Sequence, residues 1–124
     1  MRRISYDRRC ELWKTTCGCV ELRGHVARGF LDRLLGLMGQ RKVPADALML
    51  FGRCRSVHTM HMRVPIDLVW LAKPDLDGSM RVVGVRRAVR PWRAELAPEG
   101  AWGVAELAEG SAPEWAPGAR LRVR

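Results

Sequence analysis

The feature that most constrains this chain is a series of short strand-like segments in its second half. They hold alternating or continuous apolar residues between Pro, Gly and Asp turns, at residues 48–51, 56–62, 66–71, 81–89, 102–107 and 121–123. Two more short strands are expected within residues 10–23, around Gly18. So many short strands need closed or protected sheet edges, which predicts a mainly β fold, a compact antiparallel β-sandwich or barrel. The close succession of the segments within residues 48–89 predicts a β-meander there.

One amphipathic helix is predicted at about residues 26–38, ahead of these strands. Its apolar residues recur at helical spacing and are Ala27, Phe30, Leu31, Leu34, Leu35 and Met38. Gly39 stands where a C-terminal cap belongs. Gly29 and Gly36 lie seven residues apart, and each costs about 1 kcal/mol of helix propensity relative to Ala. The helix is therefore expected to pack closely on a sheet, which would offset that cost.

Length and composition predict a single domain over residues 1–124, because this size leaves no room for a second core. A hydrophobic fraction of 48% with 28% charged residues is ordinary for a globular protein. No apolar run reaches the ~18 residues of a membrane-spanning helix, and none follows the basic N-terminus as in a signal peptide. We therefore expect a cytoplasmic protein whose cysteines at positions 10, 17, 19 and 54 stay reduced.

The segment around residues 54–62 concentrates side chains that can carry chemistry. If it is one strand, Cys54, His58, Met60 and Met62 share a face and His61 points the other way. A thiol, an imidazole and two thioethers suit a soft metal ion such as copper(I) or zinc. Met and Cys are also common core residues, so packing is the favoured interpretation. No metal or cofactor is predicted, and Cys54 and His58 are the residues that a metal would use.

Two carboxylates and one sheet edge complete the candidate site. Asp67 and Glu106 either share a cleft and do acid–base work, or Asp67 caps a turn and Glu106 pairs with an arginine. Pro91 cannot donate to a sheet ladder, so Arg90 and Trp92 are expected at a sheet rim, where they suit an anionic or planar ligand. If a ligand cleft exists, these four residues are expected to line it together with His58 and His61.

Three blocks resemble the domain of unknown function 192 family. They are RGFLDRLLGLMG at 28–39, CRSVHTMHMRVPID at 54–67 and ELAEG at 106–110, and with the step at 90–92 the resemblance covers about residues 20–124. Residues 1–19 are then a variable N-terminal extension or a first strand. The resemblance implies a β-sandwich or barrel with one helix, in a bacterial and archaeal family that is often exported and has no established activity. Here residues 58–62 replace the family's usual Trp-Met-Lys-Asn-Thr, so no role of that amide or lysine is carried over.

The charge of +9 comes almost wholly from arginine, which suits phosphate recognition but also follows from a GC-rich coding sequence. No nucleic-acid-binding motif accompanies it, so the compositional interpretation is favoured. The favoured function is a non-catalytic β domain that binds a small ligand or a protein partner, rather than an enzyme. The first alternative is a metal-binding protein or metal-dependent enzyme using Cys54, His58, His61 and Asp67. The second is nucleic-acid binding through arginine.

Overall fold

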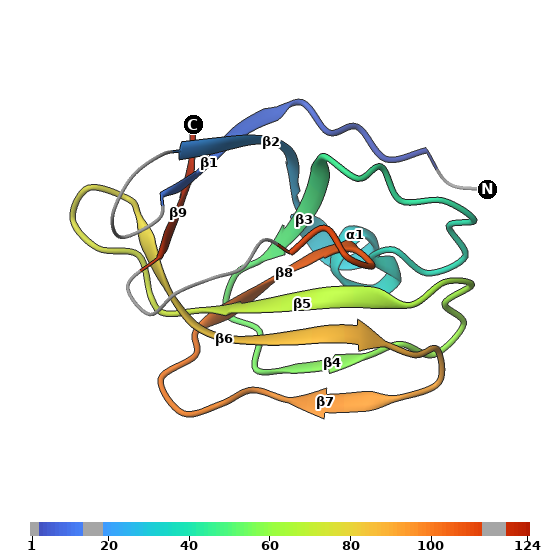
Figure 1. Cartoon of the computed structure of the whole chain (residues 1–124). Helices are drawn as coiled ribbons and strands as arrows, with labels where there is room; N and C mark the ends of the chain where they lie inside the picture. Colours follow the sequence, from blue (N-terminus) through green and yellow to red (C-terminus); the bar gives the residue numbers. More distant parts are fainter. Residues whose placement is uncertain (1–2, 14–18, 113–118) are drawn as a thin grey trace.

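Nine strands and one short helix make up the part of the chain that the computed structural model describes, residues 3–13, 19–112 and 119–124 (Figure 1). The helix is α1 (Gly29–Leu35). The strands are β1 (Arg8–Trp13), β2 (Cys19–Val26), β3 (Ala47–Phe51), β4 (Ser56–His58), β5 (Ile66–Leu71), β6 (Met80–Val89), β7 (Ala94–Leu96), β8 (Gly103–Ala108) and β9 (Arg120–Val123). The predicted fold class, mainly β with one helix, is confirmed.

Seven of the strands close into a barrel with the order β1-β2-β3-β8-β5-β6-β9. The remaining two, β4 and β7, pair with each other and run along one side of the barrel (Figure 1). All pairs are antiparallel except β2 with β3, where Arg23 to Val26 run parallel to Ala47 to Leu50. A parallel pair needs a long crossover connection, and the segment that contains α1 supplies it. The β-meander predicted for residues 48–89 is therefore wrong, since β3 pairs with β2 and β8, β4 pairs with β7, and in that section only β5 and β6 form a hairpin.

The helix is shorter than predicted, because residues at both ends of the predicted range are needed elsewhere. Val26 still belongs to β2 and pairs with Leu50, so the backbone there is extended. Gly36 ends the helix with a φ of 50°, and its N–H donates to the carbonyl oxygen of Asp32. Gly36, and not Gly39, is the C-terminal cap. Leu34 was predicted on the buried face but is 50% exposed, because the chain turns away only two residues later.

A single strand at residues 56–62 was also predicted, and it is wrong beyond His58. The chain turns at residues 59–62, where the Met62 N–H donates to the carbonyl oxygen of Thr59. His61 has a φ of 61° within this turn, a conformation that no strand contains. The predicted turn around Gly18 lies outside the described residues.

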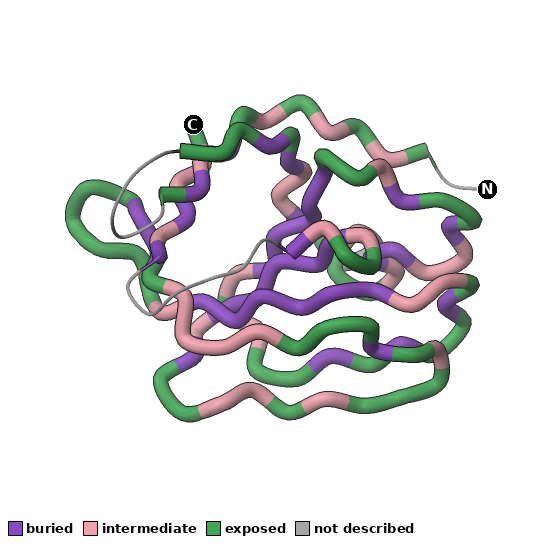
Figure 2. Tube along the Cα trace, in the orientation of Figure 1, coloured by how far each residue is buried: buried purple, intermediate pink, exposed green. Residues whose placement is uncertain are grey.

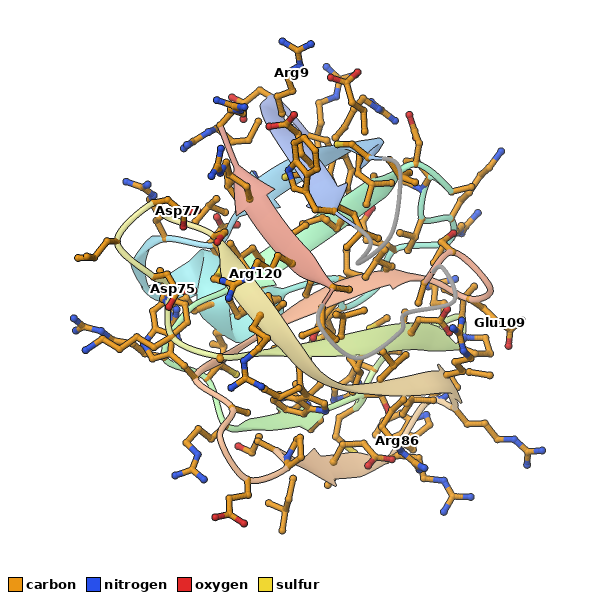
Figure 3. All side chains as sticks on the ribbon, turned by 60° about the vertical axis from the view of Figure 1, so that its left-hand side comes forward. Arg9, Asp75, Asp77, Arg86, Glu109 and Arg120 are labelled. Carbon is orange, nitrogen blue, oxygen red and sulfur yellow. The ribbon has the colours of Figure 1, made fainter. Side chains whose placement is uncertain are left out.

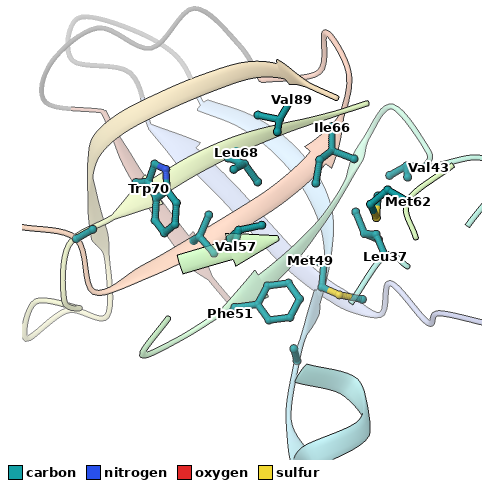
Figure 4. Packing of buried hydrophobic residues seen from close by; sticks show 13 residues of the cluster. Leu37, Val43, Met49, Phe51, Val57, Met62, Ile66, Leu68, Trp70 and Val89 are labelled. Atoms are coloured by element: carbon teal, nitrogen blue, oxygen red, sulfur yellow. The ribbon is translucent and has the colours of Figure 1, made fainter. Parts of the chain in front are cut away.

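Two apolar clusters lie on the two faces of the barrel wall. The inner cluster draws residues from all seven barrel strands, among them Cys10, Leu48, Val69, Leu107 and Leu121, and fills the barrel. The outer cluster covers the other face of β3, β5 and β8 with side chains from β4 and from the loops around α1 (Figure 4). Strand β5 is therefore buried along its whole length (Figure 2).

Candidate functional site

A small cavity lies between the outer face of the barrel wall and the segments that cover it. Its volume is about 70 Å³, and its walls come from three parts of the chain. The end of α1 and the turn after it contribute residues 33–38, and the barrel contributes Phe51 and Glu106. The segment after β3 contributes Cys54, Val57, His58, Met60 and Met62. Most of these side chains are apolar, as in small-molecule sites generally.

Glu106 is the polar residue of the barrel wall in this cavity. It lies in β8 directly opposite Met49 on β3 and Leu68 on β5, so it faces the outer apolar cluster. Gly36 passes close above it, since a methyl group added at Gly36 would lie 3.6 Å from Oε1 of Glu106 and 3.1 Å from the Phe51 ring. A larger residue at this turn would therefore narrow the space beside the carboxyl group.

The environment of Glu106 keeps its carboxyl group neutral. The residue is only 7% exposed, and its carboxyl group makes no hydrogen bond or ion pair with any described residue. Burial without such a partner disfavours the charged form and raises the pKa of Glu106 to about 8. At neutral pH the group is therefore mostly a carboxylic acid, with one O–H donor beside one acceptor.

Cys54 is the second polar group in the cavity. The half-buried thiol donates a hydrogen bond to the carbonyl oxygen of Ser56 over 3.2 Å. Burial is the main reason that the pKa of Cys54 is raised, and the carboxyl group of Glu106 adds to the effect. Two neutral acids therefore share this cavity at neutral pH.

Four sulfur-containing side chains line the cavity, namely Met38, Cys54, Met60 and Met62, together with His58. The sequence placed Cys54, His58, Met60 and Met62 on one strand face. They do meet at one cavity, although the turn at residues 59–62 and not a continuous strand brings them there. Among the described residues no three His, Cys, Asp or Glu side chains gather as a metal site would require.

Asp67 lies away from this cavity, on the opposite face of the sheet from Glu106. It pairs with Leu107, the neighbour of Glu106 along β8, and successive side chains of a strand point to opposite faces. Its carboxylate is fully buried and accepts the N–H of Ala88 at 2.8 Å and of Ala112 at 3.0 Å. Asp67 thus joins β5 to the end of β6 and to the loop after β8, which supports the turn-stabilising alternative.

His61, Arg90 and Trp92 form a third location, on the surface. The His61 and Trp92 rings meet edge to face with their centroids 4.7 Å apart, and Trp92 is 59% exposed. The Arg90 side chain is exposed and makes no ion pair with a described residue. None of these three residues lines the cavity beside Glu106. The six candidates of the sequence therefore divide among three places, and the expectation that they line one cleft is not met by this cavity.

Many arginines are paired with acids on the surface. These pairs are Arg9–Glu21, Arg23–Asp46, Arg86–Glu95, Arg120–Asp75, Arg122–Asp77 and Arg124–Glu11. Figure 3 labels both members of the pair Arg120–Asp75. All of them are at least partly exposed, and such pairs contribute little to stability. They do reduce the number of cations that remain for an anionic partner.

The sequence did not indicate the residues that cover Glu106. Arg33 donates from Nη2 to the carbonyl oxygen of Gly52 at 2.8 Å, which ties the end of α1 to the segment after β3. Gly36 then brings the backbone over the cavity. The signal was present in the two helix glycines, which indicated a close approach to a sheet, but it did not say where on the sheet the approach would occur.

Comparisons with known proteins agree with this architecture. The model of an uncharacterised family, DUF192 (Uncharacterized ACR), matches residues 14–123. A solved structure from Sinorhizobium meliloti 1021, described as a "putative transcription regulator", is 25% identical, with a TM-score of 0.79 over 98% of both chains. A protein of unknown function from Novosphingobium aromaticivorans DSM 12444 is 20% identical, with a TM-score of 0.75 over 92% of this chain and 83% of its own. No curated protein matches the sequence.

Among the described residues, no helix has the length and apolar character to cross a membrane.

Proposed function

Because the chain belongs to the DUF192 family, in which no activity is described, we propose from its own cavity that it is a non-catalytic domain that binds a small ligand through Glu106. The observation that carries this proposal is the buried carboxyl group without a described partner, on the wall of a cavity of about 70 Å³. The enclosed side-chain atoms without a partner among the described residues are Trp70 Nε1 and Arg122 Nε, so the Glu106 oxygens are not sealed off but border the cavity. A ligand in the cavity would therefore reach the carboxyl group and supply the hydrogen bonds that no described residue makes.

The protonation state of Glu106 indicates the chemical class of the ligand. A carboxylic acid presents a donor and an acceptor side by side, and an amide or a second carboxylic acid complements both at once. The apolar walls of Phe51, Val57 and Met62 suit a short hydrocarbon tail on that ligand. We therefore assign the site to a small primary amide or carboxylic acid with an apolar tail.

Binding is favoured over catalysis because of the state of the neighbouring thiol. A thiolate and not a thiol is the nucleophile in cysteine enzymes. Burial raises the pKa of Cys54, which holds it in the unreactive form. Cys54 and Glu106 then act as hydrogen-bonding groups on the wall of a binding site.

The test is a titration with butyramide, followed by nitrogen–proton correlation NMR. We expect saturable shifts in the backbone amide signals of Gly36, Phe51 and Glu106, because these residues surround the cavity. N,N-dimethylbutyramide lacks the N–H donor and should bind more weakly. Glu106→Leu replaces the carboxyl group with an apolar side chain of similar size, so this variant should not distinguish between the two amides. Glu109→Gln changes an exposed position and should bind both amides as the parent protein does. Equal binding of both amides to the parent protein would contradict the proposal.

A soft metal ion is the second candidate ligand, because four sulfur-containing side chains line the same cavity. Loading the protein with copper(I) and measuring the bound metal after gel filtration tests this. One equivalent that is lost in Cys54→Ser would support the metal. No retained copper would leave the amide site as the function of the cavity.

A further inference from the structure

Two surface turns are locked together through one buried side chain, Thr59. Its hydroxyl group donates to the carbonyl oxygen of Arg90 at 2.6 Å and accepts the N–H of Arg93 at 2.8 Å. Its backbone N–H donates to the carbonyl oxygen of Arg93, and its own carbonyl oxygen accepts the N–H of Trp92. Thr59 is fully buried, so this connection is shielded from water. The turns at residues 59–62 and 90–93 therefore form one rigid unit.

This unit presents an exposed aromatic pair. His61 has a φ of 61° and Trp92 a φ of 66°, left-handed conformations that bulky side chains rarely adopt. The two rings meet at 4.7 Å in a T-shaped arrangement, while 59% of Trp92 stays exposed. Backbone strain of this kind persists only where the surrounding structure imposes it, and it occurs often at functional sites. The fold thus holds a large apolar ring in water in a fixed orientation.

The aromatic pair is flanked by arginines that remain available for a partner. Arg93 follows Trp92 directly and Arg90 precedes it by two residues. Both are exposed, and neither makes an ion pair with a described residue. Arg63 follows the first turn and is exposed as well. Six other arginines of the chain have acidic partners. Arg90 and Arg93 differ from the remaining exposed arginines in lying beside the fixed Trp92 ring.

We propose that His61, Arg90, Trp92 and Arg93 form a binding surface for single-stranded nucleic acid. A fixed exposed ring offers a stacking platform for a base, and the guanidinium groups of nearby arginines suit the phosphates that flank that base. Duplex bases are stacked on one another and cannot reach the Trp92 ring, so the surface favours a single strand. This proposal does not depend on the cavity at Glu106, since that cavity is lined by other residues.

The test is fluorescence anisotropy with labelled oligothymidine and oligouridine, at low and at moderate salt. Trp92→Ala should weaken binding roughly tenfold, the usual effect of losing one stacked base. Arg93→Ala should weaken it and also lower the slope of log affinity against log salt by about 0.7, the value for one phosphate contact to a single strand. A purely structural role of Arg93 would not change that slope.

Matched controls lie at the other end of the barrel. Arg81→Ala removes the same charge from the start of β6, roughly 30 Å from Arg90 at ~3.3 Å per residue, and it lies beside β9. Trp13→Ala removes another exposed tryptophan, which pairs with β9 as well. Both should bind as the parent does. If Trp92→Ala fails to give a cooperative melting transition, Arg93→Ala, at an exposed side chain, carries the test.

Several results would overturn the proposal. They are the absence of oligonucleotide binding at low salt, equal losses in Arg81→Ala and Arg93→Ala, and binding of a duplex as tightly as of either single strand. Binding to anionic lipid vesicles without binding to oligonucleotides would also overturn it and would assign the surface to a membrane. Binding of either oligothymidine or oligouridine supports the proposal, and different affinities show which of the two strands the surface prefers.

Discussion

Replacing Glu106 by glutamine should change how the stability of the protein depends on pH. The carboxyl group titrates near pH 4.5 when exposed, and burial raises its pKa to about 8 in the folded protein. Between these values the unfolded chain releases the proton while the folded protein keeps it. The unfolded state then binds fewer protons, so the free energy of unfolding falls as pH rises. Glutamine has nearly the same shape and no proton to release.

The size of the effect follows from the interval between the two pKa values. Each pH unit within it removes about 1.4 kcal/mol from the free energy of unfolding. From pH 4.5 to about 8 the total loss is about 5 kcal/mol. This is a large share of the ~5–15 kcal/mol by which typical domains are stable. Glu106→Gln lacks this loss, so its stability relative to the parent should rise steadily across the same interval.

Urea unfolding of both proteins at several pH values between 5 and 8 measures this difference. Glu109→Gln is the matched control, because its side chain lies exposed three residues further along the chain (Figure 3). That variant should give a curve parallel to the parent's. A difference between Glu106→Gln and the parent that stays constant with pH would refute the reasoning, because it would mean that Glu106 is already charged in the folded protein.

Three further predictions concern other buried groups. Iodoacetamide should label Cys19 first, Cys54 more slowly and Cys10 last, as measured by peptide mass spectrometry. Cys10 should be slowest because it is fully buried and burial raises its pKa to about 11. Faster labelling of Cys10 than of Cys19 would contradict the placement of Cys10 inside the barrel. Asp67→Asn should lower the free energy of unfolding by roughly 2–3 kcal/mol in urea titrations, because its amide cannot accept both backbone N–H groups; an unchanged midpoint would show that these bonds do not matter. Thr59→Val should cost about 1–3 kcal/mol through the loss of its hydroxyl bonds, whereas Thr59→Ser should retain most of the stability, and equal losses in the two variants would assign the effect to packing.

The strand pattern could be predicted from the sequence because it is a local property. Alternating apolar residues bounded by Pro, Gly and Asp mark strands such as β5 and β6 directly. The order of the strands in the barrel is not local. The parallel pairing of β2 with β3 depends on where the connecting segment crosses the sheet. The spacing of residues in the sequence does not predict this crossing point.

The two local errors have a common cause. Residues 26–28 have a helical apolar pattern, but pairing of Val26 with Leu50 keeps the backbone extended. Residues 59–62 alternate like a strand, but the hydrogen bonds of Thr59 to the turn at 90–93 hold them in a turn. In both places a tertiary contact overrides the local pattern, as is common for short elements.

The candidate site was predictable in its residue types and not in its grouping. Cys54, His58 and Glu106 were recognised as chemically active residues and do line one cavity. Asp67 was grouped with Glu106, yet the two side chains point to opposite faces of the sheet. Only the register of β5 against β8, which pairs Asp67 with Leu107, reveals this. Gly36 and Met38 were interpreted as helix residues, and their position over the cavity follows from the early end of α1. The single-domain organisation and the cytoplasmic location stay predictions.

The most direct test of the proposed site is the titration of the Glu106 side chain itself. Carbon NMR of protein labelled in the glutamate carboxyl group measures its pKa, and Glu106→Gln identifies the signal. We predict a midpoint near pH 8, and saturating butyramide should raise it further, because the amide bonds to the protonated form. A midpoint near the ordinary value of 4.5 would contradict the account, since a charged carboxylate there would need a partner other than the neutral ligand proposed.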